Sequence, residues 1–182
     1  MAINMQALRK SMQYPTSVIL VDEVSILVDF EAIAKMIGRF CANGLKSGIQ
    51  MLLAGQDVNS ISVSKYGKKI LQNIPVRIVG RIEPTAIDSL VDEFKYDREI
   101  ISQNASKSFE IQPKKLATSW SIDANGRINL VEYRCDPVLM AAVANNPSEV
   151  KARNRNLASV QGDKFLGLKA YADEIERNCV GA

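Results

Sequence analysis

The sequence predicts an α/β protein with a mainly parallel sheet and flanking helices, followed by a β-hairpin and C-terminal helices. Short apolar runs alternate with amphipathic segments through the first half of the chain. Two alternating runs then flank a turn of sequence DANG, and the pattern beyond Pro137 is helical. Because strands and helices alternate, we expect the strands of the first half to be parallel and joined by crossover helices.

The three predicted strands of the sheet are short and mainly apolar, and the first is rich in β-branched residues. They cover residues 16–21, 49–55 and 76–82. The first two are apolar runs of a length that is typical of strands buried on both faces of a parallel sheet. The two hairpin strands lie on either side of DANG, residues 123–126, which is a strong turn signal.

The predicted helices carry apolar residues at helical spacing. They lie within residues 29–48, 64–74 and 83–94, and then from Pro137 to residue 178. Gly44 or Gly48 ends the first helix, and Pro84 lies near the start of the third. We therefore predict two domains, residues 1–110 as the α/β core and residues 111–182 as a hairpin and helical segment packed on it.

The composition excludes several classes of function. Of 182 residues, 47% are hydrophobic and 24% are charged, and a net charge of +3 does not by itself indicate a nucleic-acid partner. With 0 histidines and 3 widely separated cysteines, the chain has no zinc-ligand spacing. An odd number of separated cysteines fits a reducing compartment, so we expect a cytoplasmic protein.

Two adjacent acids, Asp22 and Glu23, end the first predicted strand. Ligands of open parallel sheets bind outside the carboxyl ends of the strands. An apolar run followed by Asp-Glu is the Walker B signature of nucleotide hydrolases. There, Asp22 would hold Mg²⁺ directly or through water, and Glu23 would orient and polarise the attacking water. The alternative interpretation is that both acids only end a strand and solvate a loop.

Polar residues near the other strands extend this candidate site. Gln56 follows the second strand, where it would be able to hydrogen-bond a γ-phosphate or the attacking water; alternatively it caps the next helix with Asp57 or Asn59. Arg77 and Arg81 bound the third strand, and a guanidinium can neutralise transition-state charge within a subunit or across an interface. The alternative for each arginine is a strand-edge salt bridge, which we favour for Arg77.

The first half of the chain resembles the second half of the motor domain of FtsK-HerA DNA pumps. The resemblance rests on VILVDEVSIL, GLKSGIQMLLAGQ and ILQNIPVRIVGRIEPTAIDSLV, and it covers residues 17–91. Members carry a Walker B strand, a helix, a strand ending in Gln and a segment Asn-Ile-Pro-x-Arg-Ile, which is residues 73–78 here. The resemblance implies a RecA-like P-loop fold, ATP and Mg²⁺ as cofactors, and a homo-oligomer, expected to be a hexamer.

The second half is similar to the tail of conjugative type IV secretion ATPases of the TraC type. This similarity rests on the hairpin and on a Pro-initiated helix that ends in AVANNPSE. It implies secretion-channel and coupling ATPase subunits as partners, transfer of DNA or protein as the work performed, and contact with the inner membrane only through partners. The winged-helix module of FtsK itself has no counterpart in the pattern.

One departure from the family concerns the glycine-rich phosphate loop that ends in Gly-Lys-Ser or Gly-Lys-Thr. The nearest fragment is YGKK, residues 66–69, which lacks the hydroxyl residue and the earlier glycine. We therefore expect the C-terminal part of a motor, inactive by itself as an ATPase. Two alternatives stay open: a non-catalytic docking module that keeps the fold, and a fragment of a double-stranded DNA translocase. For Lys65, Lys68 and Lys69, a solvated helix face is favoured over nucleic-acid contact.

Overall fold

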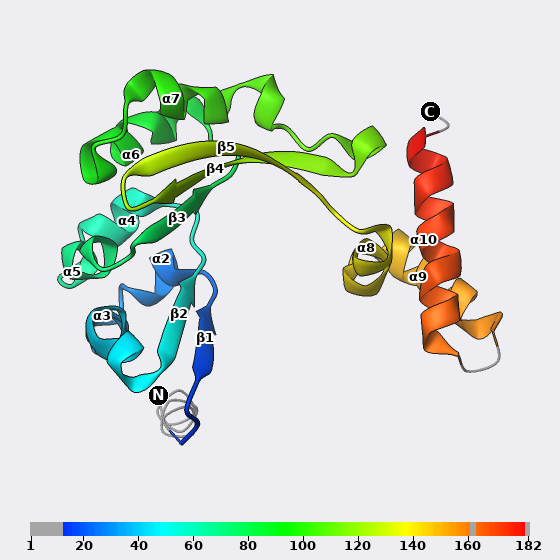
Figure 1. The fold of residues 1–182 in the computed structure, drawn as a ribbon, viewed down its shortest axis with the longest axis horizontal. Coiled ribbons are helices and arrows are strands. Elements are labelled where there is room, and N and C mark those ends of the chain that lie inside the picture. Colours follow the sequence, from blue (N-terminus) through cyan, green and yellow to red (C-terminus); the bar gives the residue numbers. More distant parts are fainter. Residues whose placement is uncertain (1–12, 161–162, 181–182) are drawn as a thin grey trace. The chain divides into compact units, whose positions relative to one another are not determined.

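The computed structural model describes residues 13–160 and 163–180, so residues 1–12 of the first predicted domain lie outside the described residues. The described chain is mixed α/β with two small sheets, one parallel and one antiparallel (Figure 1). It divides into two compact units. The first unit contains residues up to Ile78 together with 82–102 and 123–128, and the second contains 79–81, 103–122 and the residues from 129 onward.

The parallel sheet consists of β1 (Ser17–Val21) and β2 (Ile49–Leu53), as the sequence predicts. Ser17 lies opposite Ile49, and Val21 lies opposite Leu53. Between the strands lie three helical elements: α2 (Val24–Leu27), α3 (Glu31–Asn43) and the 3₁₀ turn η1 (Gly44–Ser47). Gly48 ends this crossover at φ 68°, and a Cβ there would lie 2.1 Å from the Pro15 carbonyl oxygen, so only glycine fits.

One face of this sheet packs on the core of the first unit. Ile37 of α3 and Ile70 of α5 are buried at its centre, with exposed fractions of 1% and 0%. The shorter helices α4 (Val58–Ser62) and α5 (Gly67–Gln72) complete this layer. Gly67 allows the close approach between them, because a Cβ at this position would lie 1.7 Å from the Ile61 carbonyl oxygen.

The other face of the parallel sheet differs from the prediction of burial on both faces. Val18, Leu20 and Leu52 share this face by their register and are 67%, 64% and 54% exposed. An apolar run specifies a strand that can be buried on both sides. It does not supply the second layer that would cover it.

The third predicted strand, β3 (Val76–Val79), also differs in its partner. It lies in a separate sheet with β4 (Ala117–Ala124) and β5 (Arg127–Arg134), in the order β3-β4-β5. The prediction of one parallel sheet with all three strands is therefore not what the described residues form. The reason is that apolar character specifies a strand but not its neighbour, and the hairpin edge offers β3 a continuous row of hydrogen-bonding groups.

The hairpin turn is a two-residue connection, Asn125-Gly126, between β4 and β5. Both residues have positive φ, 55° and 85°, which is the geometry of a type I′ turn. The prediction of a hairpin about DANG is confirmed. Within the first unit, the Asn125 N–H donates to the Pro75 carbonyl oxygen at 3.0 Å, which ties the turn to the start of β3.

Short helical elements connect β3 to β4. They are η2 (Pro84–Ala86), α6 (Ile87–Phe94), α7 (Arg98–Ser102), η3 (Gln103–Ala105), η4 (Lys107–Phe109) and η5 (Pro113–Lys115). Pro84 occupies the first position of η2, as its fixed φ favours. The predicted helix of residues 83–94 is thus a 3₁₀ turn that continues into an α-helix.

The C-terminal helices are α8 (Pro137–Val143), α9 (Pro147–Ala158) and α10 (Lys164–Val180), all within the second unit. Asp136 and Asn146 cap α8 and α9 ahead of a proline in the first turn. Ala141, Tyr171 and Ala172 form a small core between α8 and α10. Among the described residues, no helix combines the length and apolar character needed to cross a membrane.

Candidate functional site

The structure brings Asp22, Glu23 and Gln56 together at the carboxyl end of the parallel sheet. Glu23 and Gln56 are 33 residues apart in sequence, yet the Gln56 amide Nε2 donates to Glu23 Oε1 at 2.9 Å. The strand ends are joined by two backbone bonds, Ala54 N–H to Val21 O and Val24 N–H to Ala54 O, both 2.9 Å. The parallel register of β1 and β2 therefore places all three side chains at one edge.

Glu23 has an unusual backbone conformation. Its φ of 53° and ψ of 42° lie in the left-handed region, which costs a non-glycine residue roughly 1–2 kcal/mol. Its N–H donates to Asp22 Oδ1 at 2.9 Å, so the carboxylate of one acid supports the strained backbone of the other. Strained residues of this kind are concentrated at functional sites.

The loop after β2 directs Gln56 toward Glu23 and not toward the next helix. Asp57 is the N-cap of α4 and accepts from the N–H groups of Asn59 and Ser60 at 2.9 and 3.2 Å. A hydrogen bond from the Ser60 hydroxyl lowers the pKa of Asp57 below its ordinary value. The capping role considered for Gln56 therefore belongs to Asp57. Gly55 keeps the loop close, because a Cβ there would lie 2.9 Å from Val24 Cγ1.

Asp22 has the chemistry required of a Mg²⁺ ligand, but it would not hold the ion alone. The side chain is exposed, and its Oδ2 accepts no hydrogen bond from the described residues, which leaves this oxygen for a cation or a bound water. Within residues 13–160 and 163–180, no cluster of three or more acidic, cysteine or histidine side chains has metal-site spacing. Mg²⁺ takes six oxygens, so water and phosphate oxygens would have to supply most of them.

Arg77 is held in a buried cluster of the first unit. Its Nη1 lies 2.7 Å from Asp123 Oδ2, and its guanidinium lies 4.4 Å from the centre of the Phe94 ring. Tyr96 donates to the same Asp123 oxygen at 2.8 Å, and the Gly126 N–H donates to Asp123 Oδ1 at 2.7 Å. The salt bridge favoured for Arg77 is therefore present, although its partner is a buried hairpin residue. To act as an arginine finger, Arg77 would have to leave Asp123.

The protonation of this cluster follows from its contacts. Burial alone would raise the pKa of Asp123, but hydrogen bonds from Tyr96, Arg77 and the Gly126 N–H, with the charge of Arg77, outweigh it and lower the pKa. Burial and the hydrogen bond to Asp123 raise the pKa of the Tyr96 phenol well above its ordinary value. Asp123 is thus a stable anion, Tyr96 stays neutral, and the cluster positions the hairpin turn against β3.

Arg81 belongs to the second unit, where it pairs with Glu110 at 3.7 Å. Both side chains line a mostly apolar hollow of about 570 Å³ with Trp120. The Trp120 ring packs on Gly80, where a Cβ would lie 3.0 Å from the ring, so this tryptophan has a packing role. This salt bridge near the strand end agrees with the alternative interpretation of Arg81.

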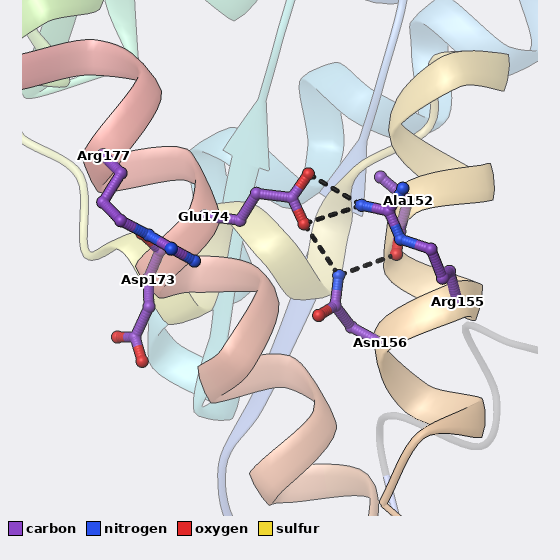
Figure 2. Close-up of polar contacts among 6 residues, drawn as sticks. All are labelled: Ala152, Arg155, Asn156, Asp173, Glu174 and Arg177. Atoms are coloured by element: carbon purple, nitrogen blue, oxygen red, sulfur yellow. Dashed lines mark hydrogen bonds and ion pairs between the residues drawn. The ribbon is translucent and has the colours of Figure 1, made fainter. Parts of the chain in front are cut away.

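Two other polar groups have structural explanations. Lys65 forms an exposed ion pair with Glu31 at 2.5 Å. It is solvated, but it lies in the turn between α4 and α5 and not on a helix face, since α5 covers only Gly67–Gln72 of the helix predicted for residues 64–74. In the second unit, Glu174 of α10 accepts from Arg155 at 2.8 and 2.9 Å and from Asn156 at 3.0 Å, and these bonds join α9 to α10 (Figure 2).

Sequence reasoning missed the residues that organise β3. Asn104 is fully buried, donates to the carbonyl oxygens of Val79 and Gly80 at 2.9 Å each, and accepts from the Ser121 hydroxyl at 2.7 Å. Asp123 falls within the predicted turn DANG, which does not indicate that its carboxylate is buried. No local signal identifies such residues, because burial depends on contacts with distant segments.

Comparison with known proteins does not assign the chain to a family: no protein-family model matches the sequence, and no curated protein matches it.

Proposed function

We propose that this chain supplies the Walker B half of a nucleotide-hydrolysing motor of the TraC type, which works in conjugative type IV secretion. The observation that carries the proposal is the hydrogen bond from Gln56 to Glu23 at the carboxyl end of two parallel strands. In this role Asp22 holds Mg²⁺, Glu23 orients the attacking water, and Gln56 responds to the γ-phosphate. ATP bound with Mg²⁺ supplies the chemistry, and the phosphate-loop half supplies the cradle for its phosphates.

The exposed sheet face supports a larger assembly. Parallel sheets are almost always covered on both faces, whereas Val18, Leu20 and Leu52 of β1 and β2 are exposed on one. We propose that the phosphate-loop half packs on this face, with β1 and β2 as part of a larger, mainly parallel RecA-like sheet. The complete motor would be a hexamer that meets coupling and channel subunits, and only these partners would bring it to the inner membrane.

A second candidate function is a docking module without catalysis, which keeps the fold and binds secretion partners. The observation that favours it is the absence of a Gly-Lys-Ser/Thr phosphate loop from the sequence. The further alternative, a double-stranded DNA translocase of the FtsK-HerA kind, rests on the resemblance of the first half alone.

Phosphate release from Mg²⁺-ATP tests these proposals. The chain alone should give no more than background turnover. Joined to a polypeptide that carries the phosphate loop, it should turn over ATP, and Glu23→Gln should keep nucleotide binding but reduce turnover by about 10²–10⁴, because the amide cannot polarise water. Asp22→Asn should also weaken Mg²⁺ retention. Asp29→Asn, an exposed acid of the same unit, is the control.

Each remaining result has a definite meaning. Turnover by the chain alone that disappears in Asp22→Ala would show a complete site and overturn the proposed division into halves. If the joined assembly binds nucleotide and hydrolyses it equally well with Glu23→Gln, the Walker B assignment is wrong. If the assembly forms but binds no nucleotide, the docking module is the better description.

A further inference from the structure

Strand β5 presents an unusually open edge. It is the last strand in the order β3-β4-β5, so its outer edge has no strand neighbour among the described residues. Leu130, Val131 and Tyr133 are 53%, 39% and 48% exposed. Because side chains alternate along a strand, Leu130 lies on one face and the other two lie on the opposite face. An exposed edge with apolar side chains on both faces is a template for pairing with another strand.

The direction of the free backbone groups can be deduced from one hydrogen bond. The Cys135 N–H donates to the Leu116 carbonyl oxygen at 2.8 Å, so residue 135 directs its backbone toward the β4 side. In an antiparallel ladder the residues alternate in this respect. The N–H and C=O groups of Leu130, Glu132 and Arg134 therefore point outward.

The end of β5 is complementary to itself when it runs antiparallel. The segment Glu132-Tyr133-Arg134 places Glu132 opposite Arg134 of a second copy, with Tyr133 opposite Tyr133 on the two-fold axis. Within one strand, Arg134 Nε lies 2.9 Å from Glu132 Oε1, so both charges lie on one face. Two copies would form a square of four alternating charges. The outward backbone groups of residues 132 and 134 would make the hydrogen bonds.

Neighbouring registers are disfavoured by the same charges. Residues that lie opposite each other in an antiparallel pair point to the same face of the sheet. A symmetric pair can therefore change register only by moving its two-fold axis from one residue to the next along the strand. One step in one direction places Glu132 opposite Glu132, and one step in the other places Arg134 opposite Arg134. Like charges directly opposite each other are destabilising. Edge charges usually prevent pairing with arbitrary strands, but here they select one register with a second copy.

We propose that β5 pairs with β5 of a second copy of this chain, antiparallel, about a two-fold axis at Tyr133. The paired segment is short, so the contact is a weak one that forms when the local concentration is high. It is isologous, since each copy contributes the same residues. The inference is independent of nucleotide chemistry, because it uses residues of the second unit only.

Sedimentation equilibrium of charge-reversal variants tests the register. The native chain should show a concentration-dependent dimer. Each of Glu132→Arg and Arg134→Glu should raise the dissociation constant about tenfold or more, because one substitution makes two cross-strand pairs repulsive. The double variant Glu132→Arg/Arg134→Glu should restore it to near the native value. Arg127→Glu, on the same strand but outside the paired segment, is the matched control.

Cross-linking provides a second readout. With Cys135→Ser in the background, Tyr133→Cys should form a disulfide-linked dimer under mild oxidation, because residues that face each other across the axis lie within disulfide range. Asn129→Cys, on the same face but farther from the axis, should not. The substituted positions of β5 are exposed and Cys135 is half-buried, so circular dichroism checks that each variant is folded. A native chain that stays monomeric, a dimer insensitive to the reversals, or equal cross-linking at positions 129 and 133 would overturn the proposal.

Discussion

Asp123 and Glu23 are carboxylates in opposite surroundings. Asp123 has a side chain that is 3% exposed and an ion pair to Arg77 at 2.7 Å. Glu23 is exposed, and its recorded side-chain hydrogen bond comes from the neutral amide of Gln56. A buried and fully bonded charge stabilises one arrangement of the chain, whereas an exposed carboxylate on a strained backbone is available for chemistry. We therefore expect substitutions of Asp123 to change stability and substitutions of Glu23 to change activity.

Replacing Asp123 with Asn should lower the free energy of unfolding by about 3 kcal/mol, because Arg77 then keeps a largely buried charge without a counterion. Urea denaturation followed by circular dichroism measures the change. The exposed Asp29→Asn should change it by less than about 0.5 kcal/mol. A similarly small effect at Asp123 would show that water replaces the carboxylate at the guanidinium.

Acid should remove the same contribution with a defined sign. Burial of Asp123 favours a higher pKa, but the hydrogen bonds from Tyr96 and Arg77 outweigh burial, so the pKa of Asp123 is lowered in the folded chain. A lowered pKa means that the stabilisation is complete above the ordinary value of 3.8 and is lost as the pH falls through the folded value. The stability difference between native chain and Asp123→Asn should therefore be constant from pH 7 to about 5 and shrink below about 4. A difference that grows on acidification would contradict this assignment.

At the scale of elements, two glycines are required for different physical reasons. Gly126 in the hairpin turn has φ 85° and no atom within 4 Å of a Cβ built there. Gly67 at the start of α5 has ordinary φ, but a Cβ would lie 1.7 Å from the Ile61 carbonyl oxygen. The first position is limited by backbone conformation and the second by contact.

Alanine substitutions should separate these two limits. Gly126→Ala should cost about 1 kcal/mol, the price of a left-handed alanine. Gly67→Ala should cost at least about 3 kcal/mol, because α4 and α5 must move apart. Thermal and urea unfolding of both variants give the comparison. Equal costs would mean that the α4–α5 contact relaxes freely.

Strand partners are the element-scale feature that periodicity does not specify. The runs 16–21 and 76–82 both predict strands, yet β1 pairs with β2 and β3 pairs with β4. The hairpin signal identified β4 and β5 correctly, and nothing in it shows that their edge receives β3. Backbone hydrogen bonds are alike in every strand, so the choice depends on side-chain contacts such as Arg77 with Asp123.

At the scale of the whole molecule, the open face of the parallel sheet is an apolar surface of the first unit that no described element covers. Leu20 and Leu52 lie opposite each other on it, 64% and 54% exposed. Their side chains gain little from folding of the described residues, since they remain in water. Leu20 and Leu52 would contribute to stability only when a second layer covers this face and buries their side chains.

The double variant Leu20→Thr/Leu52→Thr should change the free energy of unfolding by less than about 1 kcal/mol, because threonine retains strand preference and little burial is lost. It should also reduce the fluorescence of a dye that binds exposed apolar surface. Ile37→Ala, at a position 1% exposed, should instead cost about 3 kcal/mol. A large loss of stability in the double variant would show that this face is covered within the chain itself.

Local patterns placed the strands β1–β5 and the longer helices, because periodicity, prolines and glycines act on neighbouring residues, but they did not predict the short helices α2, α4 and α7. They also located Asp22, Glu23 and Gln56 after their strands. Only the tertiary structure determines that the Gln56 amide hydrogen-bonds Glu23, that Asp123 is buried in an ion pair with Arg77, and that β3 pairs with the hairpin. These contacts join residues 33 and 46 positions apart, and burial and pairing depend on which distant groups exclude water from one another.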